Sequence, residues 1–403
     1  MGLFRLLLAV AVLLQHVSGC KYAMTGGTTS VQTFYVVSGF FIAMILDLKY
    51  SRRDQLWLFY SNRALRIYAT YWLFAAIAVL LQIAGHMAAH RSVFDLWSSN
   101  STRLGSGGTW FLVLTNIFLF GQDLALFTTL GTHGLHWSVN FWQSSPIVPE
   151  FMLIPPAWSL SLELTFYLVA PWILRKRTAW IVALMVLSLL IRYGLWVNGL
   201  RRDPWSYRFF PSELCLFLGG ALAYRLVYRN PRFENLSRPW KFFAVGLVPA
   251  VVLYPLYDRS YNLFFSGTKL LYLIYVLLAV PLIFRLTSSW SADRLLGELS
   301  YPFYLCHFGI VQGLNHASQR LGVPVRAAIA IVLSCGVAYL SVVVLDHPLD
   351  RFRQSRITRF QRSGARTSAR EQLSTEPQSI EGPPISGDLA GKDGKMACGT
   401  ESA

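Results

Sequence analysis

The sequence predicts an all-α fold, a polytopic membrane helix bundle of about ten transmembrane spans plus a re-entrant segment. First, the 403 residues are 54% hydrophobic and only 14% charged, with a mean hydropathy of +0.42, whereas about 25% of residues are charged in soluble domains. Second, apolar stretches long enough to cross a bilayer as helices recur along the chain. Third, the aromatic content of 15% suits the anchoring of many helix ends at two membrane interfaces.

The predicted spans are ten apolar runs separated by polar loops. Each has about the length that crosses the hydrocarbon core, where a helix satisfies its own backbone hydrogen bonds. The runs lie at residues 4–20, 31–48, 67–85, 158–174, 178–198, 211–228, 240–257, 269–287, 298–315 and 325–346.

One further apolar run is too short to count as a span. It covers residues 110–120, before a Gly-Gln-Asp sequence interrupts it. Runs of ten to fourteen apolar residues are more typical of re-entrant or interfacial segments. We therefore predict that residues 110–126 dip into the membrane within a long external stretch from about 86 to 157.

The net charge of +16 comes mainly from basic residues in short loops, where the positive-inside rule places them. If 110–126 does not cross, the basic loops 49–66, 175–177 and 225–241 fall on one side of the membrane. We therefore predict a multi-pass protein of the bacterial inner membrane with both termini in the cytoplasm. The charge then reflects topology, and we expect no nucleic-acid partner, which would need a basic face on a soluble module.

The first run has an alternative interpretation as a cleavable signal. Residues 1–19 have a short basic start, an apolar core and small residues before Cys20, as such signals do. Removal would leave nine spans and move the basic loops to the outer side, so we expect the run to be retained.

The sequence changes character after about residue 350. Seven arginines lie between 351 and 370, and a stretch rich in Ser, Pro, Gly and Glu follows. We predict a membrane-embedded domain at 1–350 and a cytoplasmic disordered tail at 351–403 that is basic in its first half.

Arg5 and His16 lie on the first predicted helix, eleven residues apart, which places them about 20° apart in azimuth and roughly 16 Å apart along the axis. Arg5 at the cytoplasmic mouth can hold a phosphate by paired hydrogen bonds, although a purely topogenic charge is the alternative. The deeper His16 can act as a base. This spacing suits a long, thin ligand with an anionic head outside and a reactive end inside the membrane.

Two further sets of polar residues are candidates for the same site. Arg63 and Arg66 lie at i and i+3, on one helix face, where two guanidinium groups make a phosphate or carboxylate clamp. A purely topogenic positive charge is the alternative. Glu163 is the only carboxylate deep inside a predicted span and therefore needs a partner. We expect His16 to be that partner, and an ion pair with Arg192 is the alternative.

Ser300, Tyr304 and His307 share a face of the ninth predicted span at i, i+4 and i+7. This gives a second intramembrane imidazole beside a phenol, with a core histidine as the alternative. In the second span, Ser38 and Gly39 form a small pair that would let a helix or a thin ligand approach closely.

Several motifs are absent from the sequence. It contains no phosphate-binding loop, dinucleotide fingerprint, nucleophile elbow or H-E-x-x-H motif. The five cysteines include no C-x-x-C pair, so we predict neither a metal site nor a disulfide framework.

In these motifs the chain resembles the acyltransferase-3 family of integral membrane O-acyltransferases, which includes acetylases of O-antigen, exopolysaccharide and nodulation factor. The likeness runs from about residue 3 to 350, with five weak motifs in the right order. They are the R-x10-H of Arg5 and His16, the segment Phe34 to Phe40, the R-x-x-R of Arg63 and Arg66, the Trp-Ser-Leu-x-x-Glu ending at Glu163, and the Leu-Ser-Tyr-x-x-Tyr-Leu-x-His ending at His307.

The resemblance implies transfer of an acyl group, usually acetyl from cytoplasmic acetyl-CoA, to a hydroxyl of a cell-surface or exported carbohydrate or glycolipid. It implies that the histidine of the first span is catalytic and that arginines bind the CoA. We therefore expect His16 to act as general base, oriented by Glu163, with a covalent acyl-histidine left open. The remaining roles are CoA binding by Arg5, Arg63 and Arg66, and a substrate pocket lined by Ser38, Tyr304 and His307.

Longer members of that family carry a soluble esterase-like domain after the last span. The sequence after 350 has the composition of a disordered segment instead, so we expect no fused second catalytic centre. The alternative function is a polysaccharide or lipid-precursor transporter that uses the same residues as a substrate or proton path. The sequence shows no internal repeat, whereas many transporters are built from such repeats, and this argues against a transporter. A receptor-like or assembly protein would leave the deep charges unexplained.

Overall fold

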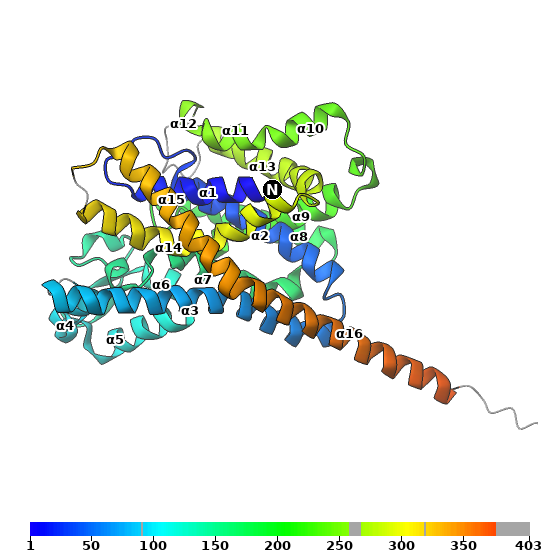
Figure 1. Ribbon diagram of the computed structural model, residues 1–403, viewed down its shortest axis with the longest axis horizontal. Helices are drawn as coiled ribbons and strands as arrows, with labels where there is room; N and C mark the ends of the chain where they lie inside the picture. The colour runs from blue at the N-terminus through cyan, green and yellow to red at the C-terminus, as the bar shows by residue number, and fades with distance from the viewer. Residues whose placement is uncertain (90–91, 258–266, 318–319, 376–403) are drawn as a thin grey trace, which may run out of the picture. The chain divides into compact units, whose positions relative to one another are not determined.

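The computed structural model describes residues 1–89, 92–257, 267–317 and 320–375, and most of them are helical (Figure 1). The chain forms two compact units, Met1–Ser355 and Arg356–Ala403. The packing and the cavities described below belong to the first unit.

The long helices follow the predicted spans closely. They form because apolar runs without internal breaks satisfy their backbone groups within the helix. They are α1 (Gly2–His16), α2 (Gly26–Leu48), α3 (Leu56–Ala89), α7 (Trp158–Ile173), α8 (Thr178–Val197), α9 (Phe210–Ala223), α13 (Gly267–Thr287), α14 (Ser291–Ala317) and α15 (Val323–Ser341).

The predicted single span 240–257 is wrong, because the chain there is broken into three short helices. They are α10 (Arg238–Val245), α11 (Leu247–Val252) and α12 (Tyr254–Tyr257). Pro249 and Pro255 have no backbone N–H and clash with the carbonyl four residues earlier, which disrupts a continuous helix.

The predicted count of about ten spans is not confirmed. Helices α1 and α7 are apolar but contain only 15 and 16 residues, and α14 carries polar residues such as His307 and Gln312 along its length. In the part of the chain that the structure describes, six helices are long and apolar enough to cross a membrane. They are Gly26–Leu48, Arg53–Met87, Thr178–Val197, Phe210–Tyr228, Gly267–Thr287 and Val323–Gln361.

The stretch expected outside the membrane folds into short elements. The segment predicted as re-entrant begins within α5 and reverses at Leu119 and Gly121, which have φ values of 64° and 83°. Its membrane placement stays a prediction. The elements are α4 (Val93–Ser99), α5 (Ser101–Phe118), α6 (Gln122–Ala125), the antiparallel strands β1 (Thr128–Leu130) and β2 (Leu135–Trp137), η2 (Phe141–Gln143), η3 (Val148–Phe151) and η4 (Pro155–Ala157). The small hairpin is an exception to the predicted all-α fold.

Short helical turns also join the long helices to their neighbours. Two π-helical turns, η5 (Tyr224–Tyr228) and η7 (Val342–Asp346), extend α9 and α15. Two 3-10 turns, η1 (Arg53–Gln55) and η6 (Pro231–Phe233), precede α3 and α10.

The tail begins as a helix, α16 (His347–Thr375). Residues 351–375, predicted to be disordered, are therefore helical, and the arginines that dominate this stretch are good helix formers. Residues 376–403 lie outside the described part of the chain. The division at residue 350 into a membrane domain and a tail stays a prediction.

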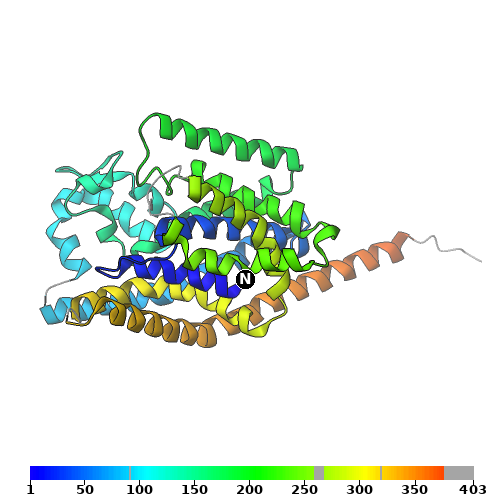
Figure 2. The ribbon, with the colours of Figure 1, turned by 90° about the horizontal axis from the view of Figure 1, so that it is seen from above.

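The core is a row of helices in which α2 packs against α9 and α1, α1 against α14, and α14 against α15 (Figures 1 and 2). Glycines permit the close crossing of α2 and α9. A Cβ atom at Gly39 would lie 1.9 Å from the carbonyl oxygen of Phe217, and one at Gly220 would lie 1.9 Å from that of Val36. As the small Ser38-Gly39 pair predicts, another helix approaches closely here, and that helix is α9.

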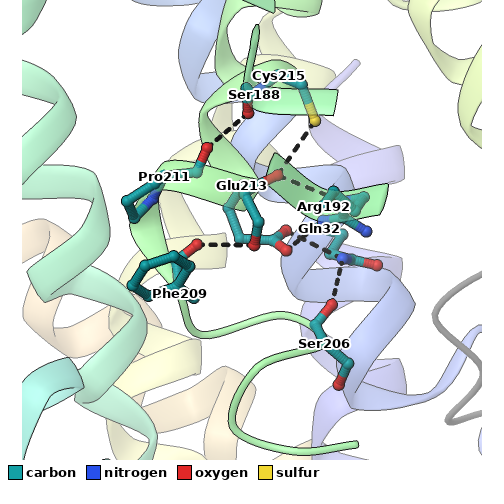
Figure 3. A network of polar contacts seen from close by, with 9 residues as sticks. Gln32, Ser188, Arg192, Ser206, Phe209, Pro211, Glu213 and Cys215 are labelled. Atoms are coloured by element: carbon teal, nitrogen blue, oxygen red, sulfur yellow. Dashed lines mark hydrogen bonds and ion pairs between the residues drawn. The ribbon is translucent and has the colours of Figure 1, made fainter. Parts of the chain in front are cut away.

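A buried polar network fastens α8 and α9 to α2 (Figure 3). Arg192 of α8 forms an ion pair with Glu213 of α9, and the two residues are 6% and 0% exposed. The amide of Gln32 on α2 donates to Glu213 at 2.9 Å and to the carbonyl oxygen of Ser206 at 3.4 Å. Arg192 therefore pairs with Glu213, and the alternative pairing with Glu163 is wrong.

Candidate functional site

An inner cavity of about 410 Å³ collects most of the predicted site residues. Six predicted site residues from five helices line it. They are Arg5 of α1, Ser38 of α2, Arg63 and Arg66 of α3, Glu163 of α7, and Tyr304 of α14.

Four arginines line this cavity, and the three that the sequence predicted, Arg5, Arg63 and Arg66, have no ion-pair partner within 4 Å among the described residues. The Nε atoms of Arg5 and Arg63 are buried without a hydrogen-bond partner, and Arg63 is only 8% exposed. A buried, unpaired guanidinium is costly unless an anion completes it. Since paired N–H groups match phosphate oxygens, the residues present fit a donor that carries several phosphate groups.

Glu163 is held by two hydroxyl groups. It accepts a hydrogen bond from the Oγ of Ser38 at 2.5 Å and another from the hydroxyl of Tyr167. Glu163 and His16 are both described, and no hydrogen bond joins them. The expectation that Glu163 orients His16 is therefore not met, because Ser38 and Tyr167 direct the carboxylate into the inner cavity. Tyr167 was missed, although its i+4 spacing from Glu163 was visible in the sequence.

His16 lies at the end of α1 and lines a second, outer cavity of about 2550 Å³. Its ring centroid is 5.5 Å from that of His307 and 5.2 Å from that of Phe308. His16 and Tyr304 are thus the two predicted site residues that line the larger cavity.

His307 lies behind this surface and lines neither of the two cavities. It is fully buried, and its Nδ1 lies 2.7 Å from the carbonyl oxygen of Tyr304, so Nδ1 donates and Nε2 is the free acceptor. Nε2 has no hydrogen-bond partner. The prediction that His307 lines the pocket is wrong, because this local bond turns the ring toward the back of His16.

Tyr304 lines both cavities, and Val31 is the other residue common to them. The hydroxyl of Tyr304 lies 2.9 Å from the carbonyl oxygen of Pro156 and 2.8 Å from the Oγ of Ser159. The inner and outer cavities are therefore neighbours that share Val31 and the hydrogen-bonded side chain of Tyr304.

The outer cavity has an aromatic and charged lining that the sequence motifs did not indicate. Arg208 pairs with Asp203 at 2.5 Å, and its guanidinium carbon lies 4.1 Å from the ring centroid of Trp158. Burial alone would lower the pKa of Arg208, but Tyr207 and Asp203 raise it above its ordinary value. Aromatic faces beside hydrogen-bonding groups suit a polar ligand with flat apolar patches.

Among the described ranges, no group of three or more His, Cys, Asp or Glu side chains could hold a metal ion.

The fold and the two cavities define a helical membrane protein in which one cavity is lined by several arginines and the other by aromatic and polar side chains. Residues 2–345 match the model of the acyltransferase-3 family, described as an acyltransferase domain. The chain therefore belongs to this family, which confirms the resemblance seen in the motifs.

Curated relatives are similar at low identity. An "Uncharacterized protein" of Aquifex aeolicus strain VF5 is 24% identical over 51% of this chain and 91% of its own. The "Putative peptidoglycan O-acetyltransferase YrhL" of Bacillus subtilis strain 168 is 25% identical over 80% of this chain and 50% of its own. A "Putative O-acetyltransferase" of Staphylococcus aureus strain COL is 23% identical over 85% and 56%. The chain spans about half the length of these two named relatives. No solved structure matches it with statistical significance.

Proposed function

We propose that the protein transfers an acyl group, acetyl in the first instance, from cytoplasmic acyl-CoA to a hydroxyl of a cell-surface or exported carbohydrate. The observation that carries the proposal is the pair of adjacent cavities. One collects three arginines without carboxylate partners, and the other exposes His16 beside aromatic and polar side chains. The family and the names of the relatives support the same chemistry.

In this proposal the inner cavity binds the donor. Arg5, Arg63 and Arg66 hold the phosphate groups of the acyl-CoA through paired hydrogen bonds. Glu163 supplies the opposing charge in the cavity and holds Ser38 and Tyr167 in place. The thioester end of the donor then points toward Tyr304 and the outer cavity.

His16 acts as the general base in the outer cavity. Its imidazole takes the proton from the acceptor hydroxyl while that oxygen attacks the thioester carbonyl carbon. The carbon–sulfur bond breaks, and the leaving thiolate receives the proton. His307 packs behind His16 at a centroid distance of 5.5 Å and restricts the orientation of its ring. A route through an acyl-histidine uses the same residues.

The test uses membranes that contain the protein, acetyl-CoA labelled in the acetyl group, and the glycan fraction of the same cells as acceptor. We expect alkali-labile label in the glycan. His16→Ala should lower transfer by about 100-fold to 10,000-fold at an equal amount of folded protein. Near-normal transfer by this variant would contradict the assignment of the base.

The donor site is tested in the same assay by Arg63→Gln combined with Arg66→Gln, which should raise the KM for acetyl-CoA. Arg232→Gln is the control, because this arginine is exposed and lines neither cavity. The transport alternative predicts instead that vesicles accumulate labelled glycan precursor without any acyl-CoA. That outcome would overturn the proposed function.

A further inference from the structure

We propose that Tyr304 limits the length of the acyl group that the protein transfers, by forming the partition between the donor cavity and His16. The proposal rests on the proposed function. It follows from the position of Tyr304 between two cavities with different chemistry.

The ring of Tyr304 is fixed at both ends. Its hydroxyl is tethered to the carbonyl oxygen of Pro156 at 2.9 Å and to the Oγ of Ser159 at 2.8 Å, and its backbone lies within α14. Only 7% of Tyr304 is exposed. The ring therefore sits in a packed setting where rotation breaks two hydrogen bonds.

The surroundings differ on the two sides of the partition. Ser159 and Phe34 line the inner cavity alone, and the ring centroid of Phe34 lies 6.3 Å from that of Tyr304. On the other side, His16 lines the outer cavity. The ring of His307, which lines neither cavity, lies between the two residues, with centroid distances of 5.6 Å to Tyr304 and 5.5 Å to His16. A thioester that enters from the arginines therefore meets Tyr304 before it reaches His16.

This geometry discriminates among acyl groups by size. A two-carbon group needs little room beside the tethered ring, whereas each further methylene must displace packed side chains. Overpacking of a close-packed site is unfavourable, and one methylene changes enzyme specificity by about 10-fold to 200-fold. The arginines bind the far end of the donor, so a longer acyl-CoA still binds but transfers poorly.

The experiment compares acetyl-, butyryl- and hexanoyl-CoA as donors for the purified full-length protein in proteoliposomes, with the glycan fraction as acceptor. The wild-type protein should prefer acetyl-CoA, and hexanoyl-CoA should inhibit acetyl transfer competitively. Tyr304→Ala should raise the ratio of hexanoyl to acetyl kcat/KM by about tenfold or more. Tyr304→Phe, which keeps the ring and removes both tethers, should raise this ratio less.

Tyr71→Ala and Tyr71→Phe are the matched controls. Tyr71 is also buried and donates its hydroxyl to a backbone carbonyl oxygen, that of Asn116, but it lines neither cavity. These variants should leave the chain-length ratio unchanged. If Tyr304→Ala does not fold, Tyr304→Phe and Ser159→Ala decide, because each removes hydrogen bonds of the partition and leaves a ring in place.

The outcomes separate this inference from the proposed function. If no acyl-CoA supports transfer by the wild-type protein, the proposed function fails. An unchanged chain-length ratio in folded, active Tyr304 variants would overturn the role of Tyr304 alone. The role of Tyr304 would also be overturned if the wild-type protein uses hexanoyl-CoA as well as acetyl-CoA, or if Tyr304→Phe abolishes transfer from every donor.

Discussion

Two carboxylates within the helix bundle, Glu213 and Glu163, show how differently one membrane protein uses the same chemical group. Glu213 is sealed in a network with Arg192 and Gln32 (Figure 3), whereas Glu163 lines a cavity and is held by Ser38 and Tyr167. An ionisable residue inside a membrane protein is a functional candidate by default. The comparison teaches that a carboxylate beside an open cavity is suited to ligand binding, whereas one enclosed by hydrogen-bonding partners stabilises helix packing.

The largest expected effect is on stability, at Glu213. Glu213→Ala leaves the Arg192 guanidinium buried without its partner, and breaking such a pair costs about 3–5 kcal/mol. We expect a large fall in the thermal unfolding midpoint of the detergent-purified protein.

The double variant Arg192→Met with Glu213→Leu is the control, because it replaces the ion pair by apolar side chains. It should recover much of the lost stability. A single variant as stable as the wild type would show that the network does not fasten the helices, and the contrast between the two carboxylates would then fail.

The second effect is on activity, at Glu163. Glu163→Gln keeps the shape of the side chain but removes the carboxylate that accepts hydrogen bonds from Ser38 and Tyr167. Without this negative charge the arginines would hold the donor in a different position. We therefore expect kcat/KM for acetyl-CoA to fall about tenfold to 100-fold, with little change in the unfolding midpoint. Unchanged kinetics combined with a lower thermal unfolding midpoint would show that Glu163, like Glu213, stabilises helix packing and does not help to bind the donor.

The smallest effect concerns Asp293, an acid at the edge of the bundle that docks the start of α1 onto α14. It accepts hydrogen bonds from the N–H groups of Gly2 at 2.8 Å and Leu3 at 3.0 Å and pairs with the amine of Met1 at 2.6 Å. Burial opposes ionisation, but these hydrogen bonds prevail and lower the pKa of Asp293 from 3.8 to about 2.

Because the pKa of Asp293 is lower in the folded protein, its stabilising contribution is complete above pH 3.8 and disappears as the pH falls toward 2. Wild-type protein should therefore unfold at a higher temperature than Asp293→Asn at about pH 6, and this difference should shrink at about pH 2.5. A difference that does not change with pH would indicate a purely steric role.

Much of the fold could be predicted from periodicity and composition, because apolar runs of spanning length become helices whatever their neighbours are. The exceptions have local causes. Pro249 and Pro255 break the run 240–257, and Leu119 and Gly121 reverse the chain after α5. Proline was visible in the sequence, but tolerance of proline inside α7 and α13 shows why the breaks could not be inferred from proline alone.

The site could be predicted only in part. Residue type and spacing were enough to bring Arg5, Arg63 and Arg66 to one cavity, because each lies near the same end of its helix. The sequence could not tell which way a helix faces in the bundle, and so it placed His307 in the pocket and joined Glu163 to His16. The Arg192–Glu213 pair joins α8 to α9, two helices that follow each other in the chain. The sequence pattern does not indicate that the first turn of α9, which carries Glu213, is buried.

The tight crossing of α2 and α9 has a consequence for Ser38, the residue next to Gly39. Because the Phe217 carbonyl oxygen lies only 1.9 Å from where a Cβ atom at position 39 would be, a larger residue there would push α2 away from α9 and shift Ser38 relative to the Glu163 carboxylate. Inactivating substitutions can therefore arise at positions that touch neither substrate nor cavity. A mutational search restricted to the cavity walls would overlook Gly39.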